Sequence, residues 1–137
     1  MTAPHAPFRT PVALRWSDLD AFNHVNNARY LTFLEQARIE WLEGIGDAWV
    51  TDEAGPVVAS ATLNFKAPIT YPADVFVELF AEKLGTSSVV IGHRILAADG
   101  TLHCDGQVVV VWIDRRSGRA TPLPDGVRRA AETLLPA

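Results

Sequence analysis

Hydrophobic residues alternate with polar or small ones along most of the chain, and one long segment departs from this pattern. Residues 12–16 alternate with the two-residue period of a half-buried strand. From Asn27 to about Gly44, apolar residues recur at helical spacing and no proline interrupts them. Asn26 or Asn27 can cap the start of this helix, because a side-chain oxygen there accepts a bond from an otherwise unpaired amide. The pattern therefore predicts a strand followed by one long helix.

Beyond Pro56 the two-residue period returns in four segments. Prolines, glycines and the dipeptide Asp99-Gly100, which is typical of a hairpin turn, separate them. The tail begins at a proline and carries apolar residues at helical spacing, so we expect a short surface helix there. The four predicted strands cover residues 57–67, 75–82, 88–96 and 102–113.

This order of elements predicts the fold class. The long helix is apolar on more than one side, which favours a central position. A run of antiparallel strands must then wrap around the helix to bury it. We therefore expect an α+β fold in a single domain, residues 1–137, with a five-stranded antiparallel sheet around one central helix. A curved sheet of this kind leaves an edge strand that a second subunit can continue, so dimerisation is expected.

Composition narrows the class of function. The 137 residues are 48% hydrophobic and 20% charged, which is the balance of an ordinary globular protein. A formal net charge of −4 argues against a nucleic-acid partner. Cys104 is the only cysteine, which suits a reducing compartment, and we expect a cytoplasmic location. The proline-marked leader has no long apolar run, and the longest run elsewhere, Val108–Ile113, is too short to span a bilayer, so no membrane association is expected.

The connection between the first strand and the helix carries the candidate chemistry. Residues 15–30, RWSDLDAFNHVNNARY, hold two aspartates, one histidine and three asparagines. These residue types are common in turns and caps, so a purely structural role is one interpretation. The other is hydrolysis, because a helix N-terminus can stabilise a developing oxyanion and a nearby carboxylate completes such a site.

This motif, together with FLEQARIEWL in the helix, strongly resembles the hotdog-fold thioesterases of the 4-hydroxybenzoyl-CoA thioesterase type and also resembles the acyl-ACP thioesterases. The resemblance covers the first third of the chain in detail. It implies a hotdog domain that hydrolyses an acyl thioester. Coenzyme A is then part of the substrate, and neither a metal nor a separate cofactor is implied.

The resemblance also implies residue roles. Asp20 would act as nucleophile or as general base, and His24 would assist proton transfer. The backbone amide of Asn27, at the helix start, would polarise the thioester carbonyl. Independently of the resemblance, Arg29 and Lys66 are candidates to contact the phosphates of coenzyme A, because exposed cations form charge-assisted hydrogen bonds to phosphate.

The motif departs from the acyl-ACP thioesterases at two places. Those enzymes place an asparagine two residues after the aspartate, where this chain has Phe22, and a glutamate on the strand after the helix, where this chain has Asn64 and Lys66. They are also double hotdogs. We therefore favour acyl-coenzyme A as substrate and a homodimer or homotetramer as the assembly. The alternatives are a hotdog enoyl-CoA hydratase or dehydratase and a non-catalytic acyl-CoA-binding protein.

Three further interpretations concern side chains outside the motif. Glu35 and Arg38 are three residues apart on the helix and predict an ion pair on its surface or at an interface. His93 shares a strand face with apolar residues, which favours a core or interface histidine. The acyl pocket is expected to be lined by Trp16, Phe22 and Trp41.

Overall fold

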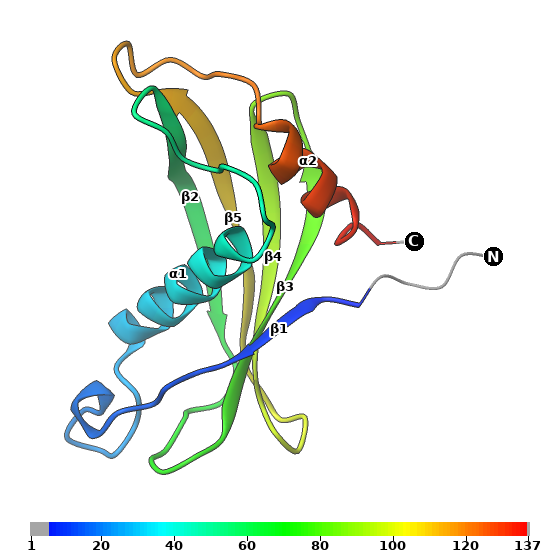
Figure 1. Ribbon diagram of the computed structural model, residues 1–137. Coiled ribbons are helices and arrows are strands. Elements are labelled where there is room, and N and C mark those ends of the chain that lie inside the picture. Colours follow the sequence, from blue (N-terminus) through cyan, green and yellow to red (C-terminus); the bar gives the residue numbers. More distant parts are fainter. Residues whose placement is uncertain (1–5, 137) are drawn as a thin grey trace.

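The computed structural model of the chain describes residues 6–136, so the first five residues of the proline-marked leader and Ala137 lie outside it. Figure 1 shows a curved sheet with one long helix lying across its concave face. The described elements are β1 (Phe8–Pro11), a 3-10 turn (Trp16–Asp18), α1 (Asn27–Glu43), β2 (Ala54–Phe65), β3 (Val75–Leu84), β4 (Ser88–Ala97), β5 (Leu102–Asp114) and α2 (Asp125–Glu132).

The sheet has five antiparallel strands in the order β1-β3-β4-β5-β2. The predicted fold class, a five-stranded antiparallel sheet around a central helix, is therefore confirmed. The chain reaches β2 directly from α1, but β2 pairs with β5 and not with β3, so it forms one edge of the sheet. The strongly apolar β5 lies between β4 and β2, as expected for an interior strand.

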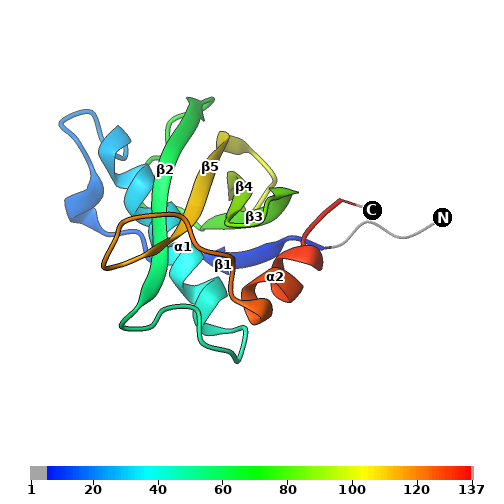
Figure 2. The same ribbon diagram turned by 90° about the horizontal axis from the view of Figure 1, so that it is seen from above.

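Helix α1 buries one face against the sheet. Asn26 is its N-cap and Gly44 its C-cap, within the predicted limits. The residues that face the sheet recur every three or four positions, because these spacings return to the same side of a helix. They are Tyr30, Phe33, Leu34, Ala37, Arg38, Trp41 and Leu42. Seen from above, α1 lies between β2 on one flank and β1 on the other (Figure 2).

The prediction of the first strand was wrong in its position. The strand occupies Phe8–Pro11 and pairs with β3, and the predicted segment 12–16 lies beyond it. Val12 donates one further hydrogen bond to the carbonyl of Val75 at 2.8 Å, after which the chain leaves the sheet. Val12 and Leu14 still pack against the core. The alternation therefore reflects which side chains are buried rather than which backbone groups are paired.

A glycine in β5 accommodates a buried histidine. Gly106 has a φ of 145°, and a Cβ atom at this position would lie 2.9 Å from Nε2 of His93 and closer still to the Thr62 carbonyl. Only glycine fits this position without displacing one of them. The expectation that His93 lies in the core is confirmed, because the side chain is 1% exposed.

The predicted C-terminal helix is α2, which covers the edge of β3 (Figure 1). Val127 and Ala131 are fully buried on its inner face. The carbonyl of Leu134 accepts a hydrogen bond from the amide of Ala81 at 3.0 Å, which fixes the end of the chain to β3. None of the described helices is long and apolar enough to cross a membrane.

Candidate active site

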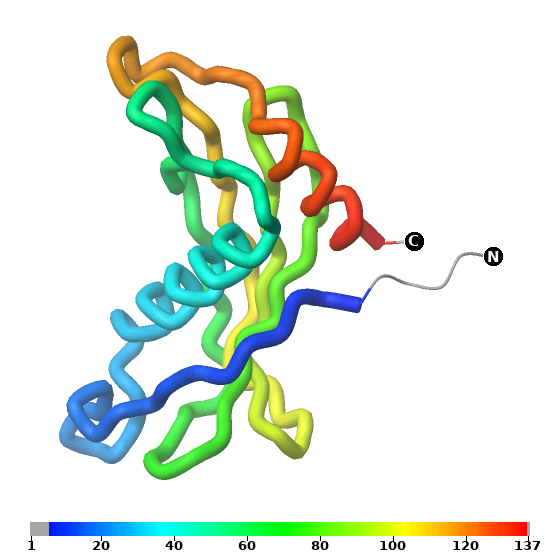
Figure 3. Tube along the Cα trace, viewed as in Figure 1, coloured from blue at the N-terminus to red at the C-terminus, as the bar shows by residue number. Residues whose placement is uncertain are grey.

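The connection between β1 and α1 extends past the N-terminal end of the helix (Figure 3) and is held at its return by backbone hydrogen bonds. The amide of Val25 donates to the carbonyl of Ile69 at 2.8 Å, and the amide of Asn26 donates to the carbonyl of Asp18 at 2.9 Å. Leu19 and Val25 also form an antiparallel bridge. These bonds fix both ends of the motif beside the helix start.

Asp20 organises the turn between these anchors. Its Oδ1 accepts hydrogen bonds from the amides of Phe22, at 2.8 Å, and His24, at 3.2 Å. Asn23, with a φ of 58°, supplies the left-handed residue that the turn requires. The second carboxylate oxygen accepts no hydrogen bond from the described residues. Asp20 therefore has the structural role expected of a turn aspartate and keeps one oxygen available for chemistry.

The helix start leaves one amide available as well. The side chain of Asn26 accepts a hydrogen bond from the amide of Ala28 at 3.1 Å, and its carbonyl accepts one from the amide of Arg29 at 2.8 Å. The amide of Asn27 donates to none of the described residues. An unpaired amide at the positive end of a helix is suited to stabilise a developing oxyanion.

A cleft of about 350 Å³ brings four of the five predicted residues together. Its walls come from the motif, the start of α1, and the end of β2 with the residues that follow. The cleft is lined by Asp20, His24, Val25, Asn27, Tyr30, Phe65, Lys66, Ala67 and Pro68.

Two aromatic rings form the apolar wall of this cleft. The rings of Tyr30 and Phe65 meet edge to face at 5.1 Å between centroids. Burial, with a smaller contribution from Cys104, raises the pKa of the Tyr30 phenol above its ordinary value, so this side chain stays neutral. Tyr30 was not among the residues singled out from the sequence, although its position three residues after Asn27 places it near the helix start.

Arg29 differs from the other predicted residues, because its guanidinium is directed to Asp18 and does not line the cleft. Its Nε lies 3.7 Å from the Asp18 carboxylate. The side chain is 43% exposed, so part of the guanidinium still faces solvent at the rim of the motif.

Asp18 is the residue of the motif that sequence reasoning missed. Its carboxylate is fully buried, accepts a hydrogen bond from the amide of Arg15 at 2.9 Å and lies 3.3 Å from the Arg15 guanidinium. Two arginines therefore compensate one buried carboxylate. The signal in the sequence was its place two residues before Asp20. In the structure Asp18 ends the 3-10 turn, and its carbonyl accepts the hydrogen bond from the helix cap Asn26.

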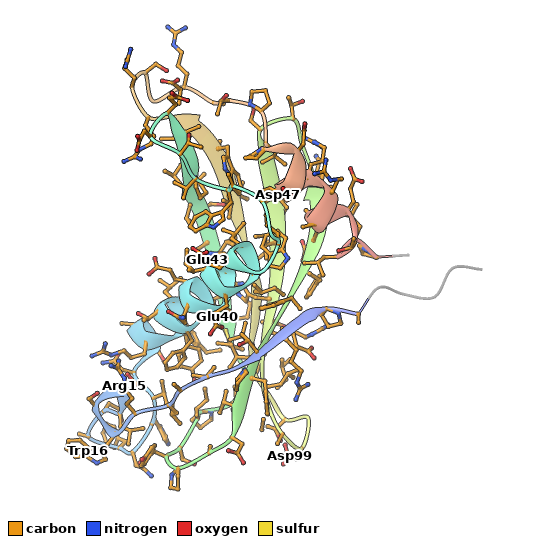
Figure 4. The ribbon with its side chains drawn as sticks, in the orientation of Figure 1. Arg15, Trp16, Glu40, Glu43, Asp47 and Asp99 are labelled. Atoms are coloured by element: carbon orange, nitrogen blue, oxygen red, sulfur yellow. The ribbon has the colours of Figure 1, made fainter. Side chains whose placement is uncertain are left out.

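The expectation that Trp16 and Phe22 line an acyl pocket is wrong for the single protomer. They are 76% and 80% exposed. Figure 4 shows Trp16 and Arg15 at the tip of the connection, away from the sheet. Trp41 does line a cavity, of about 180 Å³, between α1 and the edge strand β2.

Cys104 and His103 do not line the cleft, although both are neighbours of residues that do. Within residues 6–136, no group of three or more His, Cys, Asp or Glu side chains is arranged to hold a metal ion. Cys104 is buried, and burial raises the pKa of its thiol to about 11, which disfavours the thiolate. His103, its neighbour, lies 3.1 Å through Nδ1 from the carbonyl of Ala67.

Comparison with known proteins places this site in context. Residues 14–131 match the family described as the thioesterase-like superfamily. The long-chain acyl-CoA thioesterase FadM of Escherichia coli K12 is 29% identical over 130 residues, which cover 93% of this chain and 98% of FadM.

Two solved structures extend the comparison. A Xanthomonas campestris protein proposed to be an acyl-CoA thioesterase is 46% identical, with a TM-score of 0.76 over 88% of this chain and 99% of that one. A thioesterase from Thermus thermophilus, solved with coenzyme A and zinc, is 34% identical, with a TM-score of 0.80 over 95% of each chain.

Proposed function

The chain belongs to the thioesterase-like superfamily, and on this premise we propose that it hydrolyses acyl-coenzyme A thioesters to a carboxylate and free coenzyme A. The observation that carries the proposal is the cleft in which the Asp20 carboxylate and the unpaired amide of Asn27 lie together. FadM is an acyl-CoA thioesterase, the Xanthomonas campestris protein is proposed to be one, and the Thermus thermophilus thioesterase was solved with coenzyme A, which favours hydrolysis over the hydratase and binding-protein alternatives.

Two groups in the cleft carry out the hydrolysis, the backbone amide of Asn27 and the carboxylate of Asp20. The thioester carbonyl oxygen binds at the Asn27 amide, where the helix dipole stabilises the negative charge that develops on it. The second oxygen of Asp20 takes a proton from a water molecule, whose oxygen adds to the carbonyl carbon. When the tetrahedral intermediate collapses, the carbon–sulfur bond breaks and coenzyme A leaves as a thiolate that takes up a proton. His24, beside Asp20 in the cleft, assists this proton transfer.

An alternative route uses the same carboxylate as nucleophile. Asp20 then attacks the carbonyl carbon, coenzyme A leaves, and water attacks the Asp20 carbonyl carbon of the resulting anhydride, which releases the acyl group as a carboxylate. A single turnover in ¹⁸O-labelled water separates the two routes. The nucleophilic route leaves one unlabelled oxygen from Asp20 in the first product, whereas the general-base route puts water oxygen there.

Substrate binding extends beyond the reacting atoms. Lys66 lines the cleft, and the Arg29 side chain, two residues after Asn27, is 43% exposed; both are suited to contact the phosphates of coenzyme A. The acyl group needs an apolar surface, and the nearest is the wall formed by Tyr30 and Phe65. Replacing Lys66 by alanine should therefore raise KM more than it lowers kcat.

We also infer that the active assembly is a homodimer or a homotetramer built from such dimers. The edge strand β2 pairs with β5 on one side only and exposes apolar side chains, with Val57 at 42%, Val58 at 47% and Phe65 at 50%. An exposed apolar edge strand is a template for pairing with a second chain. Because Phe65 also lines the cleft, a second copy at this edge would complete the site.

Thiol release from short, long and aromatic acyl-CoA substrates tests the function. We expect turnover by the wild-type chain and a loss on the order of 100-fold or more in kcat for Asp20→Asn, because the amide can neither take a proton nor attack. Asp52→Asn, an exposed aspartate beyond the far end of α1, is the matched control and should keep wild-type activity. Equal rates for the wild type and Asp20→Asn would contradict the proposal.

A further inference from the structure

The flank of α1 next to β2 carries an exposed stripe in which one acidic residue stands between two apolar ones. Leu31, Glu35 and Ile39 recur every four residues on this flank, and the two apolar members are 45% and 37% exposed. The cavity of about 180 Å³ between this flank and β2 is lined by apolar side chains, among them Val57 and Val58, and by Glu35 and Arg38. Among the described residues, these two are the only charged ones that line it.

Arg38 is buried without an ion-pair partner among the described residues. The residue is 8% exposed, and its Nη1 atom has no hydrogen-bond partner among the described residues. No carboxylate of residues 6–136 lies within 4 Å of its guanidinium, not even that of Glu35, which is exposed. His93, the buried side chain that faces it, offers no negative charge. A guanidinium buried without a carboxylate is destabilising, so a partner for it is expected from outside the protomer.

The stripe is symmetric about Glu35. Leu31 and Ile39 lie four residues before and after it, so two copies of α1 that run antiparallel around a two-fold axis beside Glu35 would place Leu31 of each against Ile39 of the other. In this register Arg38 lies opposite position 32 of the other copy. Glu35 of that copy is three residues further along the helix, or about 4.5 Å, within reach of two long side chains.

We propose that the second copy supplies the missing counter-charge, with the Glu35 carboxylate of each copy paired with the Arg38 guanidinium of the other. Four alternating charges then surround the two-fold axis, flanked on each side by a Leu31–Ile39 contact. This pairing rests on the dimer proposed above and sets its register. It also explains why an exposed acid and a buried base occupy one otherwise apolar groove.

Charge complementation between two variants tests this pairing. Glu35→Arg gives a chain with cations at both positions 35 and 38, and Arg38→Glu gives a chain with carboxylates at both positions. Each variant alone should associate more weakly than wild type, by on the order of 100-fold in Kd, because like charges meet at the axis. An equimolar mixture should form heterodimers, measured by sedimentation velocity with one variant fluorescently labelled.

The mixture separates the possible roles of the two residues. A pair formed within one helix stays repulsive in both chains, so mixing would then give no stronger association than either variant shows alone. Failure of the mixture to associate while circular dichroism shows both variants folded would overturn the proposal, and so would variants that associate like wild type. An Arg38 variant that changes only acyl-chain selectivity, with unchanged mass, would instead assign the guanidinium to the substrate and overturn the pairing.

A cysteine variant keeps the test independent of how Arg38→Glu folds. Near a two-fold axis, Glu35→Cys brings two thiols close enough to form an intermolecular disulfide under mild oxidation. Cys104 does not interfere, because it is fully buried. Gln36→Cys, the matched control, lines the groove on the opposite flank of α1 and should stay uncrosslinked. If Glu35→Cys does not crosslink, or crosslinks no faster than Gln36→Cys, the register is wrong, whatever the thioesterase activity.

Discussion

His93 shows how a single residue links the core to solution conditions. Neither ring nitrogen has a hydrogen-bond partner among the described residues, and the side chain packs between α1 and the sheet against Gly106. Burial is the main reason, and the Arg38 charge the second, that the pKa of His93 falls from 6.5 to about 4. The folded protein therefore keeps this imidazole neutral.

Acid should consequently destabilise the fold through His93. Between pH 6.5 and about 4 the unfolded chain binds a proton at this residue and the folded chain does not, so the free energy of unfolding falls as the pH falls through this window. The loss amounts to at most about 3 kcal/mol. Urea denaturation of the wild type and of His93→Leu between pH 7 and 4 measures this loss in the free energy of unfolding. If both proteins show the same pH slope, the effect comes from other groups.

The residues of the candidate site could be predicted where they are close together in the sequence. Asp20, His24 and Asn27 share one short motif, and a helix start brings such residues together whatever the rest of the fold does. Lys66 was a candidate only as a cation suited to bind phosphate, and the return of β2 to the helix start places it in the same cleft. The direction of Arg29 toward Asp18 was not predictable, because it depends on the burial of that carboxylate.

At the scale of elements, the start of α1 is the feature on which the site depends. The Asn26 side chain caps the helix at the amide of Ala28, and its backbone amide binds the carbonyl of Asp18. The same residue thus fixes the helix end and the motif. The amide of Asn27 stays available because the neighbouring amides are already paired within the protein.

Removing this cap should be measurable in stability. Asn26→Ala leaves the amide of Ala28 without its side-chain acceptor, and we expect the free energy of unfolding to fall by about 1 kcal/mol. Asn26→Ser retains a capping oxygen and should lose only a few tenths of this amount. Chemical denaturation of both variants provides the measurement, and an equal loss in both would show that the cap contributes little.

The ends of a helix or strand could be predicted where the residues with buried side chains are also the ones whose backbone is hydrogen-bonded. The capped apolar helix appears at Asn27–Glu43, close to its predicted span. The first strand was misplaced because Val12 and Leu14 alternate and are buried while their backbone has already left the sheet. Pro11, the last residue of β1, is tolerated because this strand forms an edge of the sheet.

At the scale of the whole molecule, the position of β2 could not be inferred from chain order. Consecutive antiparallel strands usually pair with each other, yet β2 crosses to the far edge beside β5. This crossing exposes an apolar strand next to the cleft and the stripe of α1. The exposed edge, the cleft and Arg38, which has no ion-pair partner among the described residues, all lie beside this strand.

Placing a charge on this edge should therefore remove association and activity together. Lysine in place of Val58, which is 47% exposed on β2, opposes pairing of the edge with a second copy, because the ammonium would have to be buried. Thr133→Lys is the control, since this exposed residue lies at the C-terminal end of α2, which packs on β3 and not on β2. Light scattering gives the mass and thiol release the activity.

The two readouts distinguish the arrangements. A Val58→Lys monomer without activity, beside a Thr133→Lys protein that keeps its mass and turnover, is the result expected for a cleft completed by the second copy at β2. A monomer that retains full turnover would mean that each protomer holds a complete site, and the exposure of Phe65 would then serve substrate binding alone. A Val58→Lys protein with unchanged mass would place the interface elsewhere, and the proposed Glu35–Arg38 register, which requires α1 and β2 on the same contact, would fall with it.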